Sequence, residues 1–163
     1  MSGILRQGHP KNLTGSSGFV ADMKSVNGPA FHYYKSSSQT ISSETNTAVT
    51  FETKVVDTHN TITASGNKFT PGIAGYYFIS LCLAMTNYPA GKYIQYRERI
   101  NGSYVWSQAN YSPGTTSDFF TTISYVHYFD ENDYLEIYMR HNRGSNADTR
   151  SSQEVRFSGF RIS

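Results

Sequence analysis

The sequence has little cysteine, little charge and no long apolar run. Cys82 is the one cysteine, so no disulfide can form within the chain. Secreted domains of this size often carry disulfides, and their absence favours folding in a reducing cytoplasm. Charged residues make up 16% with a net charge of +2 and no dense basic stretch, which argues against a nucleic-acid partner. No segment predicts a membrane-spanning helix, so we expect no membrane partner.

The motifs that usually carry catalysis or transition-metal binding are also missing. There is no Gly-x-Ser-x-Gly elbow, no phosphate-binding glycine loop and no obvious carboxylate pair, so we do not expect an enzyme. Cys82 lies in an uncharged stretch, which favours a small buried residue over a nucleophile. The five histidines form no pair with metal-ligand spacing, and we expect no transition-metal site.

One acidic stretch has two interpretations. Asp130-Glu-Asn-Asp133 brings hard oxygen ligands close together, as a calcium site would require. It lacks the spaced acids and the glycine of a helix–loop–helix calcium loop, and its residues are typical turn formers. We therefore interpret it as a turn and expect no cofactor, while calcium stays open without an assigned position.

Aromatic and small polar residues dominate what is present. Thirteen Tyr and ten Phe, with many Ser, Thr, Asn and Gly residues, are typical of an all-β protein with many turns. Asn101-Gly102 separates two strand-like runs and is a strong hairpin signal. About nine or ten short strands without helices between them predict an antiparallel sandwich. The expected strands are 30–34, 48–52, 54–57, 76–85, 93–100, 104–108, 119–129, 134–139 and 154–162.

The stretch 69–85 is the centre of this pattern. Pro71-Gly72 predicts a sharp turn, and an uncharged strand follows Gly75. One face of that strand would present Tyr77, Ile79, Leu81, Leu83 and Met85 to the core. The other face also lacks charge, although a wet face of a sheet should be polar. We therefore expect another copy of the chain to cover this second face: Tyr76, Phe78, Ser80, Cys82 and Ala84.

The N-terminal region differs from the rest. Residues 1–28 are polar and glycine-rich and show no sustained hydrophobic period, so we interpret them as an extended arm preceding a head at residues 29–163. The alternative is a flexible terminus without a binding role, but the isolated apolar residues favour docking to a neighbouring protein. The start of the chain lacks a signal-peptide core, which favours synthesis in a cytoplasm. The expected docking residues are Ile4, Leu5, Leu13, Phe19 and Val20.

A ligand surface is expected around the Asn101-Gly102 hairpin and the polar loop 140–150. Exposed tyrosines and arginines are common in recognition surfaces, and aromatic faces stack on sugars. Packing within the sandwich is the alternative role for part of this set. The candidate residues are Tyr104, Trp106, Tyr111, Arg143 and Arg150.

Several motifs occur in an order that resembles a known family. They are Ala30-Phe31, Val49-Thr-Phe51, Phe69-Thr-Pro-Gly-Ile-Ala-Gly-Tyr-Tyr-Phe78, Ile100-Asn-Gly102, the 130–135 turn and Phe157-Ser-Gly-Phe160. Residues 29–163 thereby resemble the globular head of the complement q subcomponent, a jelly roll shared with tumour necrosis factor. The resemblance implies a ten-stranded homotrimeric jelly roll with Tyr76, Phe78, Ser80 and Phe157 facing the three-fold axis. Some heads of this family bind calcium.

The leader Met-Ser-x-Ile-Leu, followed by Leu13-Thr-Gly-Ser-Ser17 (Leu-x-Gly-x-Ser), resembles virion proteins of tailed bacteriophages. Animal heads usually follow a collagen-like or coiled-coil stalk, and this chain shows neither repeat. We therefore expect a virion structural protein, made in the host cytoplasm and joined by its arm to a major capsid or tail protein. It would be a capsid decoration (cement) protein or a head or tail fibre. The alternatives are a fibre tip that recognises a host-surface glycan and a cellular carbohydrate- or protein-binding module.

Overall fold

The structure is a computed structural model that describes residues 28–163. The expected docking residues of the arm lie outside this range. The described residues form strands and no helix, and the all-β expectation is confirmed. The eleven strands are β1 (Ala30–Tyr34), β2 (Thr40–Ile41), β3 (Thr47–Ala48), β4 (Thr53–Asp57), β5 (Gly75–Tyr88), β6 (Tyr93–Ile100), β7 (Ser103–Tyr111), β8 (Ser117–Phe129), β9 (Leu135–His141), β10 (Ala147–Asp148) and β11 (Arg156–Arg161).

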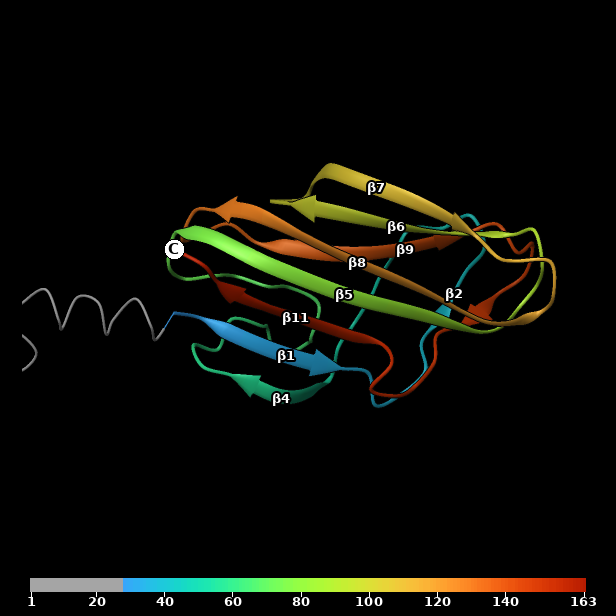
Figure 1. Cartoon of the computed structure of the whole chain (residues 1–163), viewed down its shortest axis with the longest axis horizontal. Helices are drawn as coiled ribbons and strands as arrows, with labels where there is room; N and C mark the ends of the chain where they lie inside the picture. Colours follow the sequence, from blue (N-terminus) through green and yellow to red (C-terminus); the bar gives the residue numbers. More distant parts are fainter. Residues whose placement is uncertain (1–27) are drawn as a thin grey trace, which may run out of the picture.

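The strands build two stacked antiparallel sheets, the architecture of a jelly roll (Figure 1). One sheet has the order β4-β1-β11-β5-β8 and the other β3-β9-β6-β7, while β2 and β10 form a short ribbon at one end. The chain end and the start of β1 lie at the same end of the sandwich (Figure 1). There the Arg161 N–H donates a 2.9 Å hydrogen bond to the Pro29 carbonyl.

The central strand β5 follows the predicted alternation. Tyr77, Ile79, Leu81, Leu83 and Met85 are buried in the core, because alternate residues of a strand point to opposite faces of its sheet. Strand β5 pairs with β8 from Gly75 to Tyr88 and with β11 from Tyr77 to Cys82. This continuous pairing fixes which side chains lie outside the sandwich.

The Asn101-Gly102 hairpin is confirmed. Both residues have positive φ angles, 53° and 78°, and they join β6 directly to β7. The Asn101 side chain also reaches the 130–134 turn, where its Nδ2 donates to Asp133 Oδ1 at 2.7 Å and its Oδ1 accepts from the Tyr134 N–H at 3.0 Å. The hairpin is therefore held against the opposite turn by side-chain hydrogen bonds.

The predicted strand over 48–52 is wrong in part. Strand β3 ends at Ala48 and β4 begins at Thr53. Val49 and Phe51 are buried as expected, but Val49 donates its N–H to Ile137 and Phe51 donates its N–H to Gly66. The segment thus satisfies its backbone groups with two different partners, which prevents a regular ladder. The ribbon strands β2 and β10 were not expected, and each has only two residues.

The prediction that Phe157 faces a neighbouring copy is also wrong. Its side chain is only 2% exposed, and its ring centroid lies 4.8 Å from that of Phe31 and 5.3 Å from that of Phe51. Phe160 lies three positions further along β11 and therefore points to the opposite face. Phe157 belongs to the aromatic core, and Phe160 takes the outer position.

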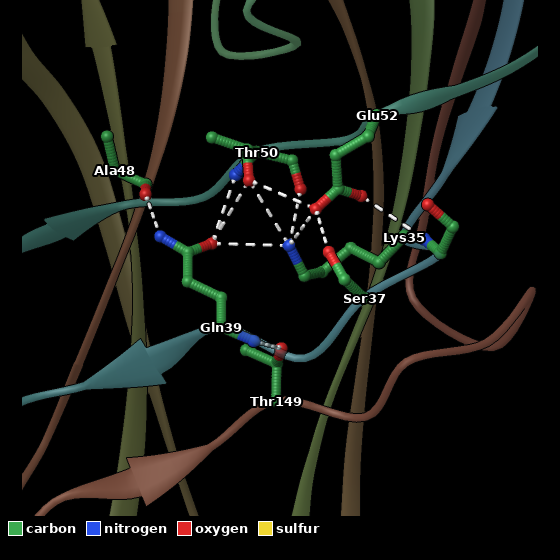
Figure 2. A network of polar contacts seen from close by, with 8 residues as sticks. Lys35, Ser37, Gln39, Ala48, Thr50, Glu52 and Thr149 are labelled. Carbon is green, nitrogen blue, oxygen red and sulfur yellow. Dashed lines mark hydrogen bonds and ion pairs between the residues drawn. The ribbon is translucent and has the colours of Figure 1, made fainter.

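A buried lysine connects the segments around β2 and β3 through hydrogen bonds and an ion pair (Figure 2). Lys35 is fully buried, and its Nζ donates to Glu52 Oε1 at 3.0 Å and to the Thr50 carbonyl at 2.9 Å. Gln39 joins the same network, since its Nε2 donates to the Ala48 carbonyl at 2.7 Å. Because the Lys35 side chain is buried and its ammonium group is already paired and hydrogen-bonded, we interpret the network as structural.

Candidate functional site

The outer face of the five-stranded sheet carries large exposed apolar side chains. Strand register places Phe160, Phe78 and Val126 in one row across β11, β5 and β8. Phe160 is 50% exposed and Val126 is 53% exposed. Exposed patches of this kind on a small protein usually mark an interaction site. We call this surface the aromatic face and define it by Tyr76, Phe78, Phe120, Val126, Tyr128 and Phe160.

The aromatic face is ordered by contacts within the chain. The rings of Tyr76 and Tyr128 lie 5.3 Å apart and those of Phe78 and Phe160 lie 5.4 Å apart. In the adjoining row, Ser124 Oγ donates to Ser80 Oγ at 3.1 Å. Aromatic cross-strand pairs stabilise a sheet and fix the positions of their rings. A partner would therefore meet a surface that is already formed.

The structure keeps three of the four predicted interface residues on one side of the sheet. Tyr76, Phe78 and Ser80 lie on the outer face of β5, whereas Phe157 lies inside. Further along β5, Cys82 and Ala84 are buried, and the Arg150 N–H donates to the Ala84 carbonyl at 3.0 Å. This end of the face is covered only in part, because Phe120, which pairs with Ala84, is 44% exposed.

A groove opens beside the aromatic face, between the edge strands β7 and β8. These strands end their respective sheets and are not paired with each other. The groove has a volume of about 560 Å³, and its lining includes Trp106, Tyr125 and the buried Glu98. We call it the edge groove. Because it shares β8 with the aromatic face, the two surfaces are neighbours on the molecule.

Glu98 is the unusual group of the edge groove. It is 4% exposed and accepts a hydrogen bond from the Tyr96 hydroxyl. Burial raises the pKa of Glu98 above its ordinary value, since desolvation disfavours the charged form. The pKa of Tyr125 is also raised, mainly by burial and to a smaller extent by the nearby negative charge of Glu98. No cation of residues 28–163 forms an ion pair with this carboxyl group.

The predicted ligand residues fall into separate places. Tyr104, Trp106 and Tyr111 all lie on β7 and are 47%, 46% and 67% exposed. Arg150 lies elsewhere, in ion pairs with Asp118 and Glu154. The three aromatic residues share β7, but an irregularity in its pairing with β6 separates two of them. Tyr104 faces Arg99 on the outside of the sheet, whereas Trp106 packs against the buried Tyr96.

Arg143 is also set apart, in the loop after β9. Its backbone N–H donates to His141 Nδ1 at 3.2 Å. The charged neighbours of Tyr104 are Arg97 and Arg99 of β6, which were not among the predicted ligand residues. The alternation Gln95-x-Arg97-x-Arg99 was the available signal, because it predicts one polar face on β6.

No group of three or more His, Cys, Asp or Glu side chains among residues 28–163 is arranged to hold a metal ion. In the 130–133 turn, Asp133 Oδ2 accepts from the Asp130 N–H at 2.8 Å, and Oδ1 accepts from Asn101. This carboxylate therefore shapes the turn, and calcium binding stays a prediction of the resemblance.

The described part of the chain contains no helix long and apolar enough to cross a bilayer.

No protein-family model matches the sequence, and no curated protein matches it either. Solved structures do resemble it. The globular domain of zebrafish complement 1qA is 18% identical, covers 83% of this chain and 98% of its own, and has a TM-score of 0.58. Murine APRIL, crystallised at pH 5.0, is 14% identical over 82% and 97% with a TM-score of 0.58. Eiger TNF from S. frugiperda is 9% identical over 83% and 94% with a TM-score of 0.59.

The class that these observations define is an antiparallel jelly-roll sandwich. More particularly, the described chain has the complement-1q and tumour-necrosis-factor type of jelly roll, as the sequence motifs predicted. At these identities the likeness concerns the fold, and a shared fold hosts many functions. The function must therefore be argued from the surfaces of this chain.

Proposed function

We propose that the chain is a virion structural protein of a bacteriophage: a homotrimeric jelly-roll head displayed on the particle surface and anchored by its N-terminal arm. The role is non-enzymatic. The exposed aromatic face of a sheet that is otherwise well packed is the observation that carries the proposal. An apolar surface of this kind is costly in a lone soluble domain, and burial against identical copies removes that cost.

Two adjacent and different surfaces favour a closed ring. A ring with three-fold symmetry requires a heterologous contact, in which one patch of a copy meets a different patch of the next. The aromatic face and the edge groove are two such patches, and they meet along β8. We propose that the aromatic face of one copy covers the edge groove of the next.

The position of the chain ends fits an anchored head. The start of β1 and the C-terminus lie at the same end of the sandwich (Figure 1), and Gly28, where the described part begins, lies close to Arg161. An arm that leaves from this end would bind a major capsid or tail protein and leave the opposite end free. Capsid decoration and a fibre position are both compatible with this arrangement.

A receptor-binding fibre tip is the second candidate function. The exposed Tyr104 and the nearby arginines of β6 favour it, since such side chains recognise sugars and acidic groups. A cellular carbohydrate- or protein-binding module would use the same surface. Display on a particle and binding to a host glycan are compatible roles for one trimer.

The mass of the purified full chain in solution, measured by light scattering, tests the proposal. We expect three times 18.3 kDa. A monomer would overturn the assembly and the role built on it. A second measurement in a calcium chelator tests the open calcium prediction, because a fall in mass would identify calcium as part of the contact.

A further inference from the structure

We propose that the outer face of the four-stranded sheet binds a saccharide that carries one acidic group, a carboxylate or a phosphate. The site is built around four residues that we call the arginine–tyrosine cluster: Arg97, Arg99, Tyr104 and Tyr138. Binding itself depends on neither the trimer nor the virion role. Only its use, recognition of a host-surface glycan, rests on the proposed function.

Strand register brings the cluster together from three strands. Arg97 pairs with Tyr138 of β9, and Arg99 pairs with Tyr104 of β7. On β6, Tyr96 and Glu98 point inward and are buried, so the alternating residues Arg97 and Arg99 point outward. The cluster therefore stands on paired strands, with a bulge in the β6–β7 pairing between Glu98 and Arg99, and strands hold side chains more firmly than loops do.

Arg99 is held between two tyrosine rings. Its guanidinium carbon lies 4.2 Å from the ring centroid of Tyr104 and 4.3 Å from that of Tyr138. Its Nη2 also donates a 2.7 Å hydrogen bond to the Tyr104 hydroxyl. A guanidinium fixed in this way loses little conformational entropy when a ligand binds.

Arg97 is fixed by a different partner. Its Nε and Nη2 donate to Gln95 Oε1 at 3.0 Å and 2.8 Å, and its guanidinium carbon lies 5.3 Å from the Tyr104 ring centroid. Burial alone would raise the pKa of Tyr104, yet the hydrogen bond from Arg99 and the two nearby positive charges hold it below its ordinary value. The surroundings of Tyr104 are therefore electropositive.

On the outer face of the four-stranded sheet, Arg97 and Arg99 have no acidic partner within ion-pair distance among the residues that the structure describes. Arg140 forms an ion pair with Glu44. Glu136 pairs with Arg99 in strand register, but the closest described cation to its carboxylate is Lys68, at 3.9 Å. No carboxylate of residues 28–163 lies within ion-pair distance of Arg97 or Arg99. Two like charges on one face of a strand repel each other, and an anion between them would relieve that repulsion.

A hollow beside the cluster supplies the rest of the site. It has a volume of about 330 Å³ and is lined by Arg97, Tyr104, Val105, Trp106 and Ser107. The volume is at the small end for ligand pockets and suits one or two sugar rings. Aromatic and apolar surface next to a guanidinium fits a sugar ring that bears an acid, because guanidinium groups bind carboxylates and phosphates through paired hydrogen bonds.

Other ligand classes fit less well. A neutral sugar would leave both guanidinium groups without a charged partner. A nucleic acid presents a row of phosphates and needs a longer basic stripe than two arginines on a chain of net charge +2. One acidic group on a small saccharide matches the charge and the size of the site.

Isothermal titration of the full chain at low salt tests the proposal. The probes are methyl β-D-glucuronide, glucose 6-phosphate, neutral methyl β-D-glucoside and sodium phosphate. We expect saturable binding of at least one acidic sugar and none of the neutral glucoside. Binding of only the glucuronide or only glucose 6-phosphate would support the site and identify the acidic group. No acidic sugar binding, or equal affinity for sodium phosphate alone, would overturn it.

Variants locate the binding on the cluster. Arg97→Gln should weaken it by about tenfold or more, the loss expected for one charge-assisted contact. Arg99→Gln should do the same, and Arg97→Gln keeps the test valid if loss of the ring contacts prevents Arg99→Gln from folding. Arg143→Gln, in the loop after β9, is the matched control and should bind like the wild type. Unchanged affinity in Arg97→Gln would overturn the site, while light scattering on the same samples reports separately on the trimer.

Discussion

The rings of Phe78 and Phe160 lie 5.4 Å apart on the outer face of the five-stranded sheet, where their strands pair residue to residue. Neither ring belongs to the core of the chain. The pair lies at the centre of the aromatic face, with Val126 on one side and Ala30 on the other. A carboxylate introduced here would be buried without a partner in the proposed trimer, at a cost of several kcal/mol.

Phe160→Asp and Phe78→Asp should therefore reduce the solution mass from three copies to one. The melting temperature should fall with the mass, because assembly stabilises the folded chain. Tyr111→Asp is the control, since Tyr111 is exposed on β7, outside the aromatic face and outside the lining of the edge groove. A mass unchanged by both phenylalanine variants, measured by light scattering, would exclude the aromatic face as the interface.

Glu98→Gln should stabilise the protein at neutral pH. Burial raises the folded-state pKa of Glu98, so the folded state binds its proton more tightly than the unfolded state does. The stability of the wild type therefore decreases as pH rises from the ordinary glutamate value, about 4.3, through the raised one. Glutamine does not ionise and can still accept the Tyr96 hydrogen bond.

Denaturant titrations at pH 4 and pH 7 check this. The advantage of Glu98→Gln over the wild type should be present at pH 7 and small at pH 4. An advantage of equal size at both pH values would show that ionisation of Glu98 is not its cause.

The lowered pKa of His141 predicts that the free energy of unfolding decreases on acidification. His141 is buried, its Nε2–H donates to the Ile41 carbonyl at 2.9 Å, and its Nδ1 accepts from the Arg143 N–H. Burial lowers its pKa, so below its ordinary value of about 6.5 the unfolded state binds a proton more readily than the folded state. Stability should fall as pH decreases from about 6.5 towards the lowered value, in the opposite direction to the Glu98 effect.

His141→Gln should remove this contribution to the pH dependence and destabilise the protein by roughly 1–3 kcal/mol if the Ile41 carbonyl loses its partner. His127, whose pKa burial also lowers, will leave a residual slope in the same direction. Chemical unfolding between pH 5 and pH 7.5 measures the slopes, and a His141→Gln profile that matches the wild type would contradict the assignment.

Lys35→Met should destabilise the head by about 2–3 kcal/mol. The substitution removes the donor for the Thr50 carbonyl and for Glu52, and the loss of one partner of a buried pair is more costly than the pair itself is stabilising. The estimate is below the value for a fully buried pair because the Glu52 side chain is 33% exposed. Lys54→Met, at an exposed position of β4, should change stability by less than about 0.5 kcal/mol.

The arm can be tested on particles. A chain that begins at Gly28 should still form a trimer, since the proposed contacts all lie in the head. It should no longer join particles that lack the protein. The docking interpretation depends on the isolated apolar residues Ile4, Leu5, Leu13, Phe19 and Val20. Full occupancy by the shortened chain in a particle-binding assay would make the arm dispensable.

Local pattern was sufficient for the outline of the fold. The hairpin could be predicted from Asn101-Gly102 alone, because both residues tolerate a positive φ angle. The alternation after Gly75 predicted which residues of β5 point inward and which point outward. Alternation was less informative at 157–160, where Phe157 and Phe160 are equally apolar and lie on opposite faces. Which of the two faces the core depends on the pairing of β11 with β5 and β1.

The sequence by itself determined the all-β class, the main turns and an uncharged outer face on β5, because these depend on the preferences of neighbouring residues. Only the tertiary structure decided which distant residues meet. Tyr138 reaches Arg99 because β9 pairs with β6, and Glu98 lies in a groove because β7 and β8 end different sheets. Such contacts follow from strand order and register, which are set by the packing of the whole core rather than by any local stretch.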